Sequence, residues 1–331
     1  METSADANEQ KIRCETQQHS AVSILNDANR TVTEPPGIKP DFLIIGAQKA
    51  ATTWLWSMLK QHPRVDMPQK KEIPFFGSAE LYRKGKEYFY DHFAGLDRSK
   101  IIGEASPTNF FDEVPFWYNK SSKLEFDSSL PTIPELVTAE LPEIKIIVSL
   151  RDPVRRAISA YYHWMQGNSW MRKGDVSPLL GLRETAIRHP KYRILESGYY
   201  ARYLKSWSKF VPKDRMRVLI VEEDVEQFPE KTISEIYQFL DVDPQFQPNG
   251  LREHMHASWG WTRIVLSYYA EPLSRKIVRS RLGRVIDRFD VLGRYAVKKE
   301  DIDFLRSKYL PEKAELESLL GRNLSCWKYD I

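Results

Sequence analysis

The chain has 331 residues and a formal net charge of +4, with 42% hydrophobic and 28% charged residues. This length and composition allow a full hydrophobic core, as in an ordinary globular protein with one large α/β domain or a domain with extensions. The positive charge is too small to indicate a nucleic-acid partner.

Cysteine use and hydropathy bear on the cellular compartment. The two cysteines, Cys14 and Cys326, lie near opposite ends and outside any metal-ligand cluster, which argues against a disulfide framework and favours a reducing compartment. No apolar segment approaches the ~18 residues that cross a bilayer, and the polar N-terminus lacks the apolar region of a signal peptide. We therefore expect a cytoplasmic protein without a metal, with a disordered polar tail over residues 1–38 and one folded domain over residues 39–331.

The predicted strands and helices alternate along the chain. Apolar runs rich in β-branched residues predict buried parallel strands at Phe42–Ile45, Ile144–Leu150 and Val218–Val221, with a weaker one at Lys100–Gly103. Helical patterns follow from Trp54, at Val154–Trp164 after an Asp152-Pro153 cap, at Gly198–Phe210 and at Glu230–Leu240. The alternation predicts an α/β fold, with a parallel sheet flanked by helices on both faces.

Three further segments have no such regular assignment. Pro107–Ser129 and Gly167–Pro190 are long and irregular, which is typical of substrate-binding lids and of plain surface insertions alike. Residues 270–300 predict a basic amphipathic helical segment. Such a helix can make peripheral contact with an anionic membrane or guide an acidic acceptor, but we favour a helix packed on its own domain with a solvated face.

The most informative segment runs from Asp41 to Trp54. An apolar run ends at Gly46, a single Lys49 follows, and the chain passes through Thr52-Thr53 into a helical pattern. A tight turn with free backbone N–H groups, a helix N-terminus and a lysine converge where an anionic oxygen can bind. The triphosphate-loop pattern G-x-x-x-x-G-K-[ST] cannot be aligned here, which indicates a different phosphate compound.

Four motifs in order resemble the sulfotransferase family that uses 3′-phosphoadenylyl sulfate (PAPS), in particular the heparan-sulfate and bacterial carbohydrate enzymes. The motifs are GAQKAATTWLWSMLKQHP after the first strand, KKEIPFF, KIIVSLRDPVRRAISAYYHWM and the closing LESLLGRNLSCW. The resemblance runs from about Asp41 to Trp327 and implies a P-loop-containing parallel sheet with PAPS as co-substrate.

The resemblance assigns the 5′-phosphosulfate of PAPS to the turn after the first strand. The residues concerned are Ala47, Gln48, Lys49, Ala50, Ala51, Thr52 and Thr53. Lys49 would neutralise charge on the leaving phosphate oxygen, an effect typically worth several kcal/mol, whereas the plain alternative is a solvated loop lysine. Ala51 stands where the family more often has glycine, so we expect a negative φ at this position.

A second site follows the predicted strand Ile144–Leu150. The Arg151 guanidinium is expected at the carboxyl edge of the sheet, where ligands of open α/β sheets bind. The resemblance implies that Arg151 and Ser159 hold the 3′-phosphate of PAPS. A guanidinium suits a phosphate because it can donate two parallel hydrogen bonds to it. The alternative is a helix-capping arginine and a neutral helical serine. Arg155 and Arg156 are expected to face solvent.

Two residues are candidates for the general base. Glu72 stands in the K-E-x-x-F-F setting in which similar glycan enzymes use a glutamate to deprotonate the acceptor hydroxyl. The alternative for Glu72 is an exposed carboxylate paired with Lys70 or Lys71. His163 lies four residues after Ser159, on the same helical face, and is the other candidate base.

The remaining site residues follow from the resemblance alone. Glu104–Phe111 resembles the segment that lines the acceptor cleft. Ala105 stands where some heparan-sulfate enzymes have lysine, and the cysteine pair of their cofactor loop is missing, which together argue against heparan sulfate as acceptor. Tyr199 opens a helix that approaches the cofactor in the family. The late cofactor loop falls near His254–Arg263, with Ser258 or Arg263 as its candidate contact.

The sequence thus predicts a sulfotransferase that moves a sulfuryl group from PAPS to an acceptor hydroxyl, with carbohydrate as the first choice. A lipid or small metabolite remains open as acceptor. Two other functions also remain open. One is a catalytically inactive protein that binds PAPS or adenosine bisphosphate, and the other is a P-loop kinase that uses ATP.

Overall fold

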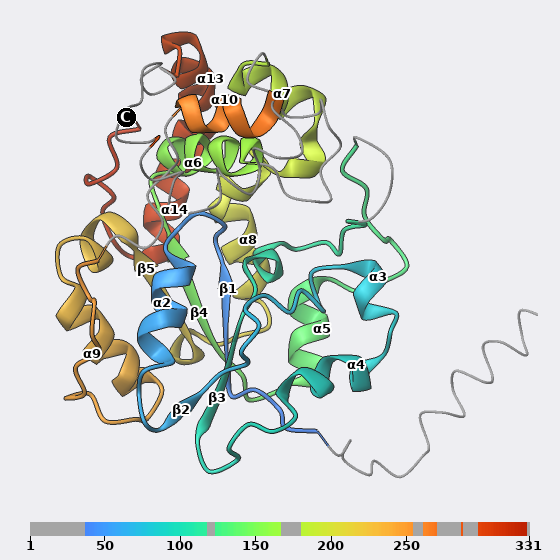
Figure 1. Cartoon of the computed structure of the whole chain (residues 1–331), viewed down its shortest axis with the longest axis vertical. Coiled ribbons are helices and arrows are strands. Elements are labelled where there is room, and N and C mark those ends of the chain that lie inside the picture. The colour runs from blue at the N-terminus through green and yellow to red at the C-terminus, as the bar shows by residue number, and fades with distance from the viewer. Residues whose placement is uncertain are drawn as a thin grey trace, which may run out of the picture. The chain divides into compact units, whose positions relative to one another are not determined.

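A sheet of five parallel strands forms the centre of the computed structural model (Figure 1). Its strand order is β2-β3-β1-β4-β5. The strands are β1 (Phe42–Gly46), β2 (Val65–Asp66), β3 (Ile101–Ala105), β4 (Lys145–Leu150) and β5 (Met216–Ile220). The structure describes residues 37–117, 123–166, 180–253, 261–269, 286 and 297–329.

The central strand is β1, which pairs with β3 on one side and β4 on the other. Phe42 lies opposite Gly103 in β3 and opposite Lys145 in β4. Every residue of β1 is buried, which explains why this strand is a continuous apolar run. The four predicted strands are confirmed, with ends shifted by one or two residues. The two-residue strand β2 was not predicted, because it is too short to show a period.

Alternate residues of β1 face two separate hydrophobic layers. Phe42 and Ile44 pack with α2 (Thr52–Leu59) and α9 (Pro229–Phe239). Leu43 and Ile45 belong to the larger layer on the other face of the sheet. Its helices include α5 (Ile133–Glu140), α6 (Pro153–Met165) and α8 (Tyr200–Trp207). Figure 1 shows α2 and α9 on one side of the sheet and α5 on the other. The predicted α/β fold with helices on both faces is therefore confirmed.

Several elements were not expected from the sequence. The other helices are α3 (Ala79–Tyr82), α4 (Lys86–Tyr90), α7 (Leu182–Arg188), α10 (Trp261–Tyr269), α13 (Lys299–Tyr309) and α14 (Lys313–Leu320). Short helical turns lie at Asp91–Phe93, Pro107–Phe110, Pro190–Tyr192, Glu196–Gly198, Lys213–Arg215, Val221–Val225 and Leu310–Glu312. The predicted irregular stretches thus contain structure: Pro107–Ser129 has a helical turn and a Pro115–Phe126 bridge, and Gly167–Pro190 contains α7.

Local capping sets the ends of two helices. The Asp152 carboxylate accepts hydrogen bonds from the backbone N–H groups of Val154 and Arg155, at 2.9 and 3.3 Å, and Pro153 is the first residue of α6. The predicted cap is confirmed. Helix α8 is shorter than the predicted Gly198–Phe210, because a separate helical turn over Glu196–Gly198 precedes it.

The C-terminal segment braces the carboxyl ends of β4 and β5. Asp152 accepts a hydrogen bond from the backbone N–H of Tyr329 at 2.7 Å. Glu222 accepts one from the Asp152 N–H at 3.0 Å and one from the Trp327 indole at 2.9 Å. Burial raises the pKa of both carboxyl groups. The closing sequence motif therefore fixes the edge of the sheet from which Arg151 emerges.

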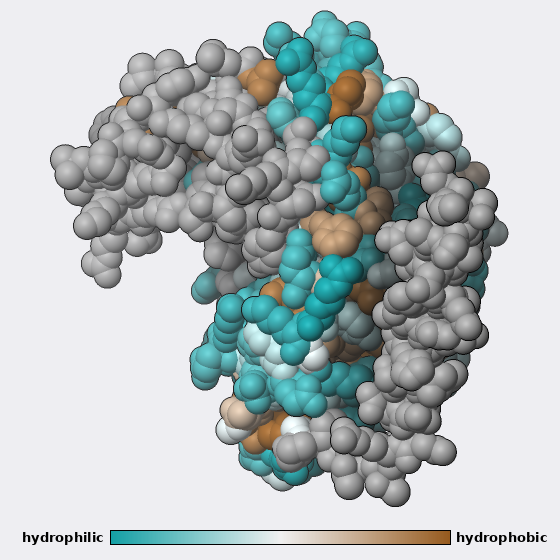
Figure 2. All heavy atoms as spheres, turned by 90° about the vertical axis from the view of Figure 1, so that its right-hand side faces the viewer, coloured by the Kyte–Doolittle hydropathy of each residue, from teal (hydrophilic) through white to brown (hydrophobic). Residues whose placement is uncertain are grey.

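Two predictions fall on residues outside the described part of the chain. Residues 1–36 of the expected tail are not described, and neither are 270–285 and 287–296 of the expected basic segment. The division into a tail and a domain over residues 39–331 stays a prediction. Within the described ranges, no helix combines the length and hydrophobicity needed to cross a bilayer. Figure 2 shows that the described side chains on the face bearing α3 are mainly hydrophilic.

The contact between β1 and β3 gives a direct test of this packing. A Cβ atom added at Gly103 would lie 2.1 Å from the Phe42 ring. We expect Gly103→Ala to lower the free energy of unfolding by about 1–3 kcal/mol, as overpacking of a tight core does. Combining it with Phe42→Leu should recover part of that loss, which chemical denaturation of the two single variants and the double variant measures. If the losses of unfolding free energy in the two single variants simply add up in the double variant, the contact between Gly103 and Phe42 is refuted.

Candidate functional site

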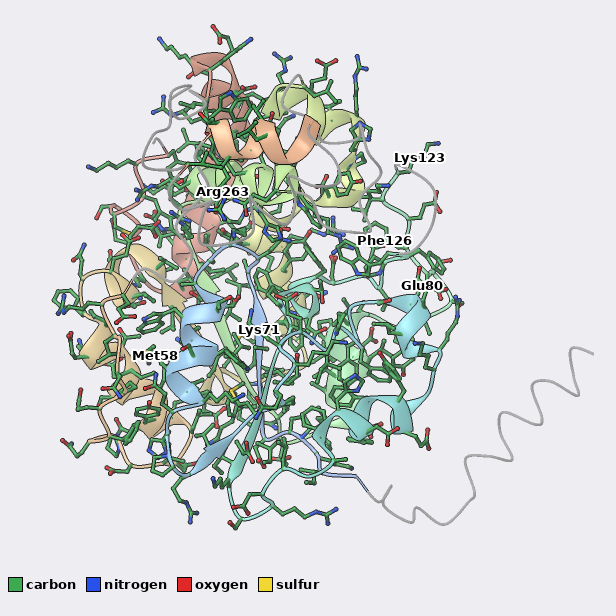
Figure 3. All side chains as sticks on the ribbon, in the orientation of Figure 1. Met58, Lys71, Glu80, Lys123, Phe126 and Arg263 are labelled. Carbon is green, nitrogen blue, oxygen red and sulfur yellow. The ribbon has the colours of Figure 1, made fainter. Side chains whose placement is uncertain are left out.

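A cleft of about 1250 Å³ lies at the carboxyl edge of the sheet. The turn after β1, the residues after β3 and the start of α6 all line it, because the carboxyl ends of parallel strands meet at one edge. Figure 3 labels two residues of this region, Lys71, which contacts Thr53 of α2, and Arg263 of α10. Among the described residues, no group of three or more His, Cys, Asp and Glu side chains is arranged to hold a metal ion. The expectation of metal-free chemistry stays a prediction.

The turn after β1 divides into buried anchors and residues that line the cleft. Ala47 and Ala50 are buried, and the Ala47 N–H donates to the Ser149 carbonyl of β4 at 2.7 Å. The Ala50 N–H donates to the Ala47 carbonyl at 3.2 Å. The residues of the turn that line the cleft are Gln48, Lys49, Ala51, Thr52 and Thr53. The amides of both alanines thus shape the turn and already have backbone partners.

The expected negative φ at Ala51 is wrong. Ala51 precedes α2 with φ 61° and ψ 17°, and Lys49 has φ 66°. A left-handed conformation costs an L-residue roughly 1–2 kcal/mol relative to the right-handed one. The glycine more usual in the resembled family would avoid this strain. The rest of the turn holds Ala51 in place, and such strain is common where a backbone must face a ligand.

Lys49, Lys71 and Arg151 are three of the cations that line the cleft. Burial lowers the pKa of Lys49, and the charges of Arg151 and Lys71 lower it further. The backbone carbonyl of Arg151 accepts a hydrogen bond from the Tyr200 hydroxyl at 2.9 Å. The buried Nε of the Arg151 side chain has no hydrogen-bond partner within the described ranges. Ser159 of α6 lines the same cleft. The positive charges of these side chains repel one another, and the unpaired Nε of Arg151 lacks an acceptor. A ligand with several anionic oxygens would relieve both costs, so these residues fit such a ligand.

Glu72 also lines the cleft. It has φ 72°, and its carboxylate lies 3.3 Å from the Lys71 ammonium, so the pairing considered from the sequence is present. Lys71 also donates to the Thr53 hydroxyl at 3.2 Å. Lys71 therefore connects the candidate base to the first turn of α2. From the sequence, Lys71 was only one of two possible surface partners of Glu72, because its contact with Thr53 joins segments that are distant in the chain.

The buried carboxyl group of Glu104 holds the backbone next to Glu72. Glu104 of β3 accepts hydrogen bonds from the Ile73 N–H at 3.1 Å and from the Ser106 hydroxyl at 2.5 Å. Burial raises the pKa of Glu104 to about 7, with those two hydrogen bonds opposing the rise and the Glu72 charge adding to it. Glu104 thus positions the backbone that carries Glu72. The sequence predicted only that Glu104 belongs to a segment lining the acceptor cleft.

The other candidate residues divide into those near the cleft and those away from it. His163 of α6 lines the cleft together with Ser159. Tyr199 is absent from the described lining and packs on Tyr309, with ring centroids 5.6 Å apart. Arg263 is buried in α10, next to lining residues of that helix, whereas Ser258 falls in residues 254–260, outside the described part.

The expectation that Arg156 faces solvent is wrong. Its side chain is fully buried, and its guanidinium donates to the Ile194 carbonyl. Arg155, in contrast, is exposed and lines the cleft. The two differ because adjacent residues of an α-helix point about 100° apart. Arg156 lies on the buried side of α6, where its long stem lets the guanidinium reach a backbone carbonyl.

Comparisons with known proteins bear on this geometry. Residues 39–258 match the family model described as the sulfotransferase domain. Membrane-associated sulfotransferase kil1 of Dictyostelium discoideum is 25% identical, over 70% of this chain and 63% of its own. Bifunctional heparan sulfate N-deacetylase/N-sulfotransferase 2 of Homo sapiens is 30% identical, over 62% of this chain and 22% of its own. The chain therefore spans less than two thirds of the length of these relatives.

A solved structure shares the fold. The sulfotransferase from Alicyclobacillus acidocaldarius superposes with a TM-score of 0.59 at 22% identity, covering 88% of this chain and 99% of that one. At this level of identity the likeness concerns the fold alone. It agrees with the parallel sheet and the flanking helices described above.

The buried Glu104 predicts a pH dependence of stability. Its pKa is about 7 in the folded protein against 4.5 for the free group, so the folded state binds more protons between these values. The stabilisation is therefore complete below about pH 4.5 and is lost as the pH rises through about 7. At about 1.4 kcal/mol for each pKa unit, the loss is on the order of 3 kcal/mol.

Glu104→Gln should remove this contribution, so its free energy of unfolding should fall less than that of the wild type over this pH range. Denaturant titrations at several pH values measure the difference. Glu226→Gln, which changes an exposed carboxylate in the lining of the same cleft, is the matched control and should behave as wild type. Parallel pH profiles for Glu104→Gln and wild type would refute the assignment.

Proposed function

The chain belongs to the sulfotransferase domain family, and on that premise we propose that it transfers a sulfuryl group from PAPS to a hydroxyl of a carbohydrate acceptor. The observation that carries this proposal is the meeting of Lys49, Lys71 and Arg151 around one cleft. A doubly phosphorylated adenosine with a sulfuryl group supplies anionic oxygens at two ends. A set of cations from two neighbouring strand ends suits such a ligand.

Lys49 acts on the phosphate side of the bond that breaks. Transfer forms a bond between sulfur and the acceptor oxygen and breaks the bond between sulfur and the 5′-phosphate oxygen. Negative charge then develops on that phosphate oxygen, and the Lys49 ammonium donates a hydrogen bond to it. Because the lysine is already desolvated, the interaction needs little reorganisation when the charge develops. The Thr52 and Thr53 hydroxyls assist at the same turn.

Arg151 and Ser159 select the 3′-phosphate. Both line the cleft, Arg151 from the end of β4 and Ser159 from α6. The unsatisfied Nε of Arg151 gives the guanidinium a donor for a phosphate oxygen. This pair distinguishes PAPS from ATP, which has no 3′-phosphate.

Glu72 accepts the proton of the acceptor hydroxyl as the new bond forms. Its carboxylate is about half exposed at 53%, which leaves one side open to an incoming hydroxyl. Lys71 orients it through the 3.3 Å ion pair, and Glu104 fixes the backbone that follows it. His163 lines the same cleft and is the alternative base.

The names of the relatives bear on the acceptor and on the location. Several relatives carry heparan sulfate in their names, which favours a carbohydrate hydroxyl over a lipid or a small metabolite. Position 105 is a buried alanine, and the argument against heparan sulfate itself stands partly on that residue. A cytoplasmic location and peripheral membrane contact both stay predictions, and kil1 is membrane-associated by name.

Replacing the base gives the most direct test of the mechanism. Glu72→Gln keeps the shape of the side chain but removes its basicity, so turnover with a PAPS donor and a glycan pool should fall about 10²–10⁴-fold. Affinity for 3′,5′-adenosine bisphosphate should not change. Transfer of radiolabelled sulfuryl groups, read by mass and counting, measures the rate, with Glu226→Gln as the matched control.

The same assay separates the alternatives. Wild-type turnover in Glu72→Gln together with a large loss in His163→Gln would assign the base to His163. Label transfer from ATP but not from PAPS would favour the kinase. Tight bisphosphate binding without transfer to any pool would favour a protein that has lost its chemistry.

A further inference from the structure

Arg193 is a buried cation that the proposed transfer reaction does not use. It follows the helical turn Pro190–Tyr192, has φ 52° and is only 2% exposed. Its side chain nevertheless contributes to the lining of the cleft. None of the three guanidinium nitrogens has a hydrogen-bond partner within the described ranges. A guanidinium carries five N–H donors, so this side chain holds an unusual amount of unused hydrogen-bonding capacity out of solvent.

Aromatic rings surround the Arg193 guanidinium. Its central carbon lies 3.5 Å from the centroid of the Phe111 ring, 5.0 Å from that of Trp117 and 5.5 Å from that of Phe126. Phe126 is labelled in Figure 3, on the segment that pairs with Pro115. Aromatic rings contact the flat faces of a guanidinium through cation–π interactions. The N–H donors lie in the plane of the group, so these contacts do not provide them with acceptors.

The nearest carboxylates do not neutralise this charge by direct contact. Asp112 and Glu113 are paired with Arg202, at 2.7 and 2.8 Å. Glu196 is itself buried with an oxygen that lacks a hydrogen-bond partner among the described residues, and burial raises its pKa. Burial lowers the pKa of Arg193 to about 10, which leaves it protonated at neutral pH. The cleft thus contains a second positive site besides the Lys49, Lys71 and Arg151 group.

We propose that Arg193 binds a carboxylate of the acceptor, so that the preferred acceptor is an acidic sugar that carries its reacting hydroxyl and a carboxylate on the same or neighbouring rings. This inference rests on the proposed function and extends it to the acceptor side of the cleft. A planar carboxylate matches the in-plane fork of a guanidinium whose faces are occupied. Trp117 lines the same cleft beside Arg193.

The position of Arg193 relative to the base fits one acceptor spanning both. Arg193 and Glu72 line the same cleft from different segments, the turn before α8 and the loop before α3. One acceptor that fills this cleft can therefore contact both residues. A neutral acceptor would leave the buried cation without a partner, which is a cost that discriminates strongly between ligands.

The test compares acidic and neutral forms of the same sugar. The probes are oligogalacturonate and heparosan tetrasaccharide, each beside its methyl ester, titrated calorimetrically into protein saturated with 3′,5′-adenosine bisphosphate. We expect wild type to bind at least one free acid ten or more times more tightly than its ester. Arg193→Met should reduce that preference to within twofold, while Arg155→Met, which removes an exposed arginine of the same cleft, should keep it.

Folding is checked by the thermal midpoint of each variant, and Arg193→Lys serves if Arg193→Met does not fold. Lysine keeps the charge but lacks the planar fork, so most of the preference should disappear. Equal binding of acid and ester in both series, binding of neither, or a preference that survives loss of the arginine would overturn the inference. If the bisphosphate itself fails to bind, the proposed function fails instead, so the two failures are distinguishable.

Discussion

The site depends on the mutual repulsion of cations that the strand order forces together. With β1 between β3 and β4, the turn after β1 and the residue after β4 open on the same edge of the sheet. Lys49 and Arg151 therefore face one space, and burial leaves neither well compensated. An arrangement of this kind is stable only while the core holds it, and it becomes favourable when an anionic ligand enters.

The surrounding structure supplies that support through buried carboxyl groups. Glu104 fixes the segment that carries Glu72, and Asp152 and Glu222 tie the ends of β4 and β5 to the C-terminal segment at Trp327. Each group gives up solvation for hydrogen bonds to backbone or indole N–H groups, which burial makes stronger. The third and the closing motif of the sequence thus serve one purpose, since Asp152 and Trp327 both hold the carboxyl edge of the sheet in place.

The sequence predicted the sheet well, because buried parallel strands such as Phe42–Ile45 are continuous apolar runs. It also placed Lys49, Glu72 and Arg151 in segments that the fold brings to one cleft. It missed what depends on distant contacts. The buried state of Arg156 and the contact of Lys71 with Thr53 leave no periodic pattern, and the left-handed Ala51 contradicts the preference of its residue type. The aromatic surroundings of Arg193 come from three separate segments, so no local motif could show them.

The central claim is that two neighbouring strand ends bind opposite ends of one doubly phosphorylated adenosine. Calorimetric titration of the protein with 3′,5′-adenosine bisphosphate and with 5′-AMP, in wild type and in Arg151→Met, tests it most directly. We expect wild type to bind the bisphosphate at least tenfold more tightly, and Arg151→Met to lose that preference while still binding 5′-AMP. Equal affinity of wild type for the two nucleotides, or a preference that survives in Arg151→Met, would contradict the account.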